Sequence, residues 1–113
     1  PTGLYLFALA SNTRPTASSM LYALPATNIS TNGHLCQGTA VLPKSVTLDT
    51  LREVEATFFD ADGTHTNTAN ILRGIEKTNA ADLMRYWREK AKSDSRVKAS
   101  ELHPYRTLGE VLA

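Results

Sequence analysis

The chain has 113 residues, 42% of them hydrophobic, and a formal net charge of +1. These values fit one small folded domain and exclude a disordered chain, while the near-neutral charge argues against a nucleic-acid binder driven by bulk charge. No run of about 18 apolar residues occurs, so no membrane-spanning helix is expected, and the single cysteine favours a reducing, cytoplasmic compartment.

Two short apolar runs open the chain and predict an antiparallel strand pair. Residues 3–10 and 20–24 are rich in large apolar and aromatic side chains, and a polar stretch over 11–16 separates them. Because strand-like sequence begins immediately after Pro1, we expect a domain that is truncated at its N-terminus.

Residues 25–44 are irregular and contain the only cysteine, Cys36. Asn32-Gly33 predicts a tight turn within this stretch, because both residue types tolerate a positive φ.

Helical patterns follow. Residues 47–59 place apolar side chains at spacings of three and four, and Thr47 can cap the helix. A polar loop over 60–70 leads to a second predicted helix over 80–92, capped by Asn79. Its expected inner side consists of Leu83, Met84, Trp87 and Ala91.

The end of the chain predicts a loose segment and a short helix. Pro104 interrupts residues 93–106, which we expect to be extended or irregular. Thr107 and Glu110 have the spacing of a capping box and predict a terminal helix.

Tyr86 and Trp87, in the helix predicted over 80–92, stand at core spacing, where packing is the expected role.

Together these patterns predict one α+β domain over residues 1–113. An antiparallel strand meander and a cysteine-bearing loop occupy 1–46, and a helical part occupies 47–113.

The segment ATNISTNGHLC, residues 26–36, resembles the active-site stretch of ubiquitin-conjugating enzymes. In that family a His-Pro-Asn triplet leads through a short loop to the catalytic cysteine. Asn28 matches the asparagine of the triplet, eight residues before Cys36. Ala26 and Thr27 replace its histidine and proline. The resemblance implies a ubiquitin-conjugating (UBC) fold.

Further segments narrow the resemblance to divergent bacterial members. FFDADGTHTN (58–67), RYWRE (85–89) and TLGEVLA (107–113) are similar to the PRTRC-system protein B group, prokaryotic ubiquitin-conjugating family D. The resemblance implies three partners: a ubiquitin-like protein, a ThiF-type activating enzyme and a JAB-type metalloprotease.

The candidate chemistry is acyl transfer on Cys36. A thiolate is both a nucleophile and a leaving group, and a free thiol with a pKa of about 8.5 is partly ionised at neutral pH. An amide donor from Asn28 could stabilise the oxyanion of the tetrahedral intermediate, or it could hold the loop in shape.

Two histidines are further candidates. His34 is two residues from Cys36 and on the same side of an extended backbone, where it could lower the thiol pKa or relay a proton. The resemblance implies that His65, in the polar loop, could help to orient the incoming amine. Both could equally be ordinary surface histidines.

Other kinds of site are not indicated. The histidines and the cysteine are too scattered for zinc, and no glycine-rich phosphate loop is present, so no metal or cofactor is expected. Cys36 could also be a small buried hydrophobe.

Two functions remain open at this point. One is an enzyme that accepts a ubiquitin-like modifier as a thioester on Cys36 and transfers it to an amine. The alternative is a catalytically inactive UBC-fold binding module of a bacterial plasmid or defence system.

Overall fold

The computed structural model describes residues 3–35, 43–45, 47–60 and 70–113. The elements run in the order β1 (Phe7–Ala8), β2 (Met20–Ala23), η1 (Leu48–Thr50), α1 (Leu51–Asp60), α2 (Ala80–Ser93), η2 (Ala99–Glu101), β3 (Pro104–Thr107) and α3 (Leu108–Leu112).

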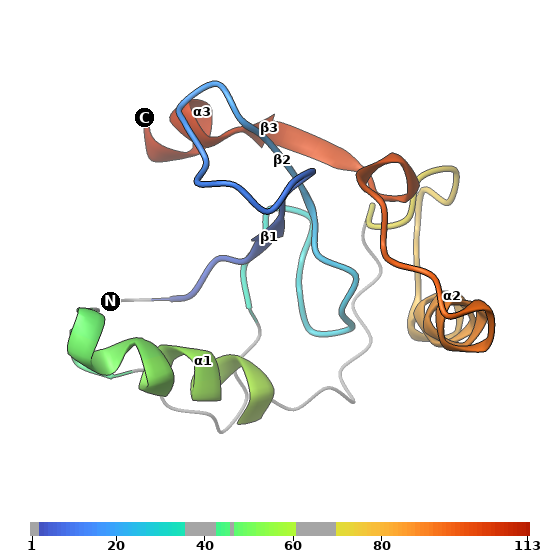
Figure 1. The fold of residues 1–113 in the computed structure, drawn as a ribbon, viewed down its shortest axis with the longest axis horizontal. Helices are drawn as coiled ribbons and strands as arrows, with labels where there is room; N and C mark the ends of the chain where they lie inside the picture. Colours follow the sequence, from blue (N-terminus) through green and yellow to red (C-terminus); the bar gives the residue numbers. More distant parts are fainter. Residues whose placement is uncertain (1–2, 36–42, 46, 61–69) are drawn as a thin grey trace.

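A three-stranded antiparallel sheet has the order β1-β2-β3 (Figure 1). Phe7 pairs with Ala23 across β1 and β2, so the predicted antiparallel strand pair is confirmed. Met20 pairs with Thr107 across β2 and β3, and this pairing makes β2 the central strand. The structure is therefore α+β, a three-stranded antiparallel sheet with helices, as the sequence predicted.

Isolated bridges continue the sheet beyond β1. Tyr5 pairs with His34, and Leu35 pairs in turn with Ile29, both in antiparallel register. Two backbone bonds fix this extension: Leu6 N–H donates to Gly33 O (2.9 Å) and Leu35 N–H donates to Leu4 O (2.8 Å). The segment that precedes Cys36 is thus held between the start of the chain and residue 29.

The helices begin at the predicted caps. Thr47 precedes η1, and α1 continues from it. At α2, Asp82 N–H donates to Asn79 Oδ1 (2.9 Å) and Asn79 N–H donates back to the Asp82 carboxylate (3.0 Å), which satisfies two N-terminal donors. Thr107 and Glu110 make the same reciprocal arrangement at α3.

The core lies between the sheet and α2. It consists of Ala23, Ile71, Leu72, Leu83 and Leu102, with Leu83 as the buried residue of α2. Figure 1 shows α1 at the lower left and α2 at the lower right, well apart in this view, with α3 beside β3. No helix within the described ranges combines the length and the apolar content needed to cross a membrane.

In the helical part, one prediction was incomplete and another was wrong. Residues 93–106 were expected to be extended or irregular, and Pro104–Thr107 form the paired strand β3. Pro104 stands at the first position of this edge strand, where no ladder donor is required. The inner side of α2 carries Tyr86 and Lys90, both half-buried, whereas Met84 and Trp87 are 60% and 45% exposed.

The apolar face of the first helix is also more exposed than its pattern indicated. Leu48 and Leu51 lie open to solvent, 87% and 51% exposed, whereas Val54 is half-buried and Thr57 is buried. Residues 61–69, most of the predicted polar loop, are outside the described residues.

Candidate functional site

Asn28 is almost completely buried, with 6% of its surface exposed. It lies in a turn between Pro25 and the bridge residue Ile29, and it lines a pocket of about 500 Å³. The indole of Trp87 and the side chain of Arg88 line the same pocket from α2. Asn28 is therefore a nearly buried polar residue in the wall of a mostly apolar pocket.

The backbone brings Asn28 close to the segment that leads to Cys36. Ile29, the next residue, pairs with Leu35, and Ser30 N–H donates to His34 O (3.0 Å). Ile29 and Leu35 are both fully buried, 1% and 0% exposed, so this pairing is fixed by packing as well as by hydrogen bonding. Cys36 itself is outside the described residues.

The Asn32-Gly33 turn predicted from the sequence closes this pair of segments. Gly33 has a φ of +87°, and its N–H donates to Ser30 O (2.9 Å). Asn32 Oδ1 accepts from the Ser30 hydroxyl (2.5 Å) and from His34 N–H (3.2 Å). The asparagine side chain thereby tightens the turn from inside, as Asx side chains commonly do.

His34 is half-buried and packs toward the start of the chain. Its ring lies edge-on to Tyr5, with centroids 5.1 Å apart, and a Cβ added to Gly3 would lie 3.0 Å from His34 Nε2. The neighbouring residues Gly33 and Leu35 are buried, so exposure alternates along this segment. His34 and Asn28 thus lie on the two segments that the predicted Asn32-Gly33 turn connects.

His65 is outside the described residues, so its expected role is not addressed by the structure. The first described residue after that segment is anchored near the turn: Asn70 N–H donates to Thr31 Oγ1 (3.2 Å). The two stretches thus meet, although 39 positions separate them. No local sequence pattern indicates this contact.

The family comparison matches nearly the whole chain. The model described as prokaryotic E2 family D matches residues 1–104. The chain belongs to prokaryotic E2 family D. No curated protein and no solved structure matches it. Membership of family D relates the chain to ubiquitin-like conjugation systems.

Trp87 and Arg88 are site residues that sequence reasoning missed in this family D domain. The indole N–H donates to Pro25 O (2.8 Å), which ties α2 to the turn before Asn28. The tryptophan falls in the RYWRE segment, and its amphipathic ring is the signal that could have indicated a surface position.

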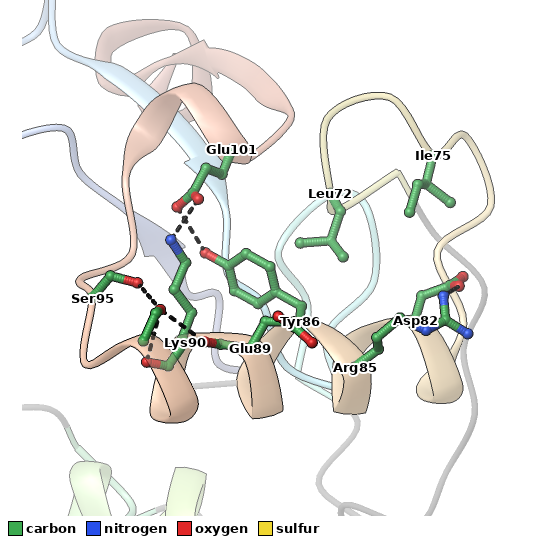
Figure 2. A pocket seen from close by; sticks show the side chains of 10 residues that line it. Leu72, Ile75, Asp82, Arg85, Tyr86, Glu89, Lys90, Ser95 and Glu101 are labelled. Atoms are coloured by element: carbon green, nitrogen blue, oxygen red, sulfur yellow. Dashed lines mark hydrogen bonds and ion pairs between the residues drawn. The ribbon is translucent and has the colours of Figure 1, made fainter.

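A separate polar cluster joins α2 to η2 in the family D domain (Figure 2). Lys90 Nζ lies 2.5 Å from a Glu101 carboxylate oxygen, and the Tyr86 hydroxyl donates to the other oxygen (3.2 Å). The hydrogen bond from Lys90 and the backbone N–H of Lys98 lower the pKa of Glu101. Burial and the adjacent Glu101 charge raise the pKa of Tyr86 to about 12, so it remains a donor.

This cluster lines a second pocket of about 340 Å³. Its charges are paired with one another, so its main effect is to hold η2 against α2. No group of three His, Cys, Asp or Glu side chains suited to a metal ion occurs among the residues that the structure describes.

Proposed function

We propose that Cys36 accepts a ubiquitin-like protein as a thioester and passes it to an amine. The thiolate attacks the carbonyl of the thioester on a ThiF-type activating enzyme, and the activating enzyme's cysteine leaves as a thiolate. An acceptor amine then attacks the new thioester, loses a proton and releases Cys36 as a thiolate. A JAB-type protease of the same system would remove the modifier by hydrolysis.

The observation that carries this proposal is the pairing of Ile29 with Leu35 in a chain of prokaryotic E2 family D. Asn28 precedes one member of the pair and Cys36 follows the other. In an antiparallel pair that continues by one residue, these two positions face each other.

Side-chain alternation supports access to the thiol. Gly33 and Leu35 are buried, whereas His34 between them is partly exposed. Because neighbouring side chains of an extended segment point to opposite faces, an extended backbone beyond Leu35 would put position 36 on the His34 side. Under the proposal His34 assists thiol ionisation, and His65 orients the acceptor amine.

The buried amide of Asn28 supports a role in stabilising the oxyanion. A preorganised donor inside an apolar hollow is worth about 3 kcal/mol when it points at the developing charge. Under the proposal, Asn28→Ala keeps thioester formation measurable but slows acyl transfer by about 100-fold. Asn32→Ala is the matched control, because that amide bonds only within the turn among the described residues.

The decisive experiment incubates the chain with the activating enzyme, ATP and the ubiquitin-like protein. We expect an adduct that dithiothreitol cleaves and that Cys36→Ala does not form. Cys36→Ser should give either no adduct or an ester that resists dithiothreitol. A thiol-sensitive adduct on Cys36→Ala would eliminate this mechanism, since the chain has no other cysteine.

A second candidate is a catalytically inactive UBC-fold binding module. The observation that favours it is the replacement of the family's His-Pro by Ala26 and Thr27, next to an open pocket that contains Asn28. This reading predicts no adduct in the same reaction, together with retained binding of the modifier or the activating enzyme.

A further inference from the structure

Trp87 stands as a ridge between two pockets. One pocket of about 500 Å³ extends from the indole toward Asn28 and Met84, and the other, of about 340 Å³, extends toward Leu9 and Val97. Both pockets share Trp87, Pro25 and Ala26 as walls. We call the two adjoining pockets together the Trp87 groove.

The groove is apolar and open to solvent. Trp87, Met84 and Leu9 are 45%, 60% and 40% exposed, which is high for large apolar side chains in one neighbourhood. Contiguous exposed apolar surface of this kind marks an interaction site more often than scattered single residues do.

The indole is held in position before any partner arrives. Its N–H donates to Pro25 O (2.8 Å), and its ring lies edge-on to Tyr86 with centroids 5.5 Å apart. A fixed aromatic anchor loses little conformational entropy on binding, as is typical of residues that dominate interfaces.

Charge indicates what kind of partner fits. Arg88 is the only charged residue among the described residues that line the two pockets. Two ion pairs occur among the described residues, Arg85 with Asp82 and Lys90 with Glu101. Both line the pocket on the other flank of α2. Within the described part of the chain, Arg88 thus has no carboxylate partner and stands beside apolar walls.

We propose that the Trp87 groove docks an extended segment of a partner protein that carries two apolar side chains and an acidic side chain at alternate positions, so that all three face the groove. Apolar side chains two positions apart point to the same side of an extended segment and could occupy the pockets on both sides of the indole. The carboxylate pairs with Arg88. This surface requires no thioester chemistry, so it can hold or fail independently of the role of Cys36.

Trp87 is the only tryptophan in the chain, so its fluorescence reports directly on the groove. The probes are two blocked peptides, Ac-Gly-Leu-Ala-Leu-Ala-Glu-Gly-NH2 and Ac-Gly-Glu-Ala-Leu-Ala-Leu-Gly-NH2, which place the glutamate on the leucine side at either end of the segment. Each is compared with its glutamine counterpart. We expect a saturable change in emission below about 10 mM for at least one glutamate peptide, and at least threefold weaker binding of its glutamine form.

Substitutions on α2 separate charge in the groove from charge elsewhere. Arg88→Ala and Arg88→Gln should each weaken binding of the glutamate peptide about three- to tenfold and leave the affinity for the glutamine peptide unchanged. Arg85→Ala is the matched control, since Arg85 is on the same helix but lines the other pocket. It should leave both affinities within about twofold.

Three results would overturn the proposal. The first is that neither glutamate peptide saturates. The second is equal affinity for the glutamate and glutamine forms, or an equal loss in the Arg85 and Arg88 variants. The third is an emission change that follows protein concentration without peptide, because the groove would then join copies of this chain.

Discussion

Replacement of Gly33 by alanine should destabilise the domain by about 2–4 kcal/mol, from two separable causes. The residue has a φ of +87°, a conformation that costs an L-residue about 1 kcal/mol. An added Cβ would also lie 2.4 Å from Phe7 Cζ, and relief of such overpacking costs about 1–3 kcal/mol more. The Phe7 ring stacks on Tyr105 at a centroid distance of 5.6 Å, so it cannot move without disturbing β3.

Gly74 supplies a matched control. Its φ is +92°, but nothing lies within 4 Å of an added Cβ. Gly74→Ala should therefore cost about 1 kcal/mol, the conformational part alone.

Urea unfolding followed by circular dichroism measures both substitutions. Gly33→Ala should also cost less in a Phe7→Leu background, where the ring is absent. If Gly33→Ala costs no more than Gly74→Ala, or if Phe7→Leu brings no relief, the steric argument for this turn is refuted.

Three further predictions concern the helical part. Thr78→Val should lower the free energy of unfolding, measured in urea, by about 2–4 kcal/mol, because the buried hydroxyl accepts from two backbone N–H groups that would lose their acceptor. A decrease below about 0.5 kcal/mol would contradict this account. Asn79→Ala should lower the free energy of unfolding by about 1 kcal/mol, because the helix cap is lost. A thermal midpoint equal to that of the unsubstituted protein would argue against the cap. The pKa of Glu101 is lowered in the folded state, so its stabilising effect is present above the ordinary carboxyl pKa and is lost as the pH falls through the folded pKa. Glu101→Gln should flatten the acid limb of the stability curve, and an unchanged limb would show that Lys90 does not provide this stabilisation.

The strands and caps were predictable because their signals are local. Apolar runs around a polar turn are sufficient for β1 and β2, and Asn79 and Thr107 each carry their cap partner three residues later. The Asn32-Gly33 turn was equally accessible, because its geometry depends on the residues that form it.

The inner side of α2 was not predictable from apolar spacing. Lys90 is half-buried because Glu101 neutralises its charge, and the hydrogen bond from the Trp87 N–H to Pro25 O holds the partly exposed indole in place. Each partner is 11 or more positions away, so no pattern within the helix reveals it. Long aliphatic stems also let lysine cover apolar surface, which a pattern of apolar letters misses.

The pairing of β3 with β2 was not predicted, for a related reason. Pro104 breaks a strand pattern when read alone, and only the position of β3 at the sheet edge makes a proline acceptable. Within the candidate site, the Asn32-Gly33 turn followed from the sequence. The roles of Asn28, His34, Cys36 and His65 remain predictions.

The central strand also determines when this domain can fold. Met20 pairs with Thr107, so β2 acquires its second neighbour only after more than 80 further residues have been synthesised. A nascent chain that has reached only the end of α2 leaves one edge of β2 open, and unpaired edges recruit other chains. Pairing of strands so far apart in the sequence makes folding slow compared with that of a helical domain of equal size. We therefore expect the emerging chain to depend on protection by the ribosome or a chaperone.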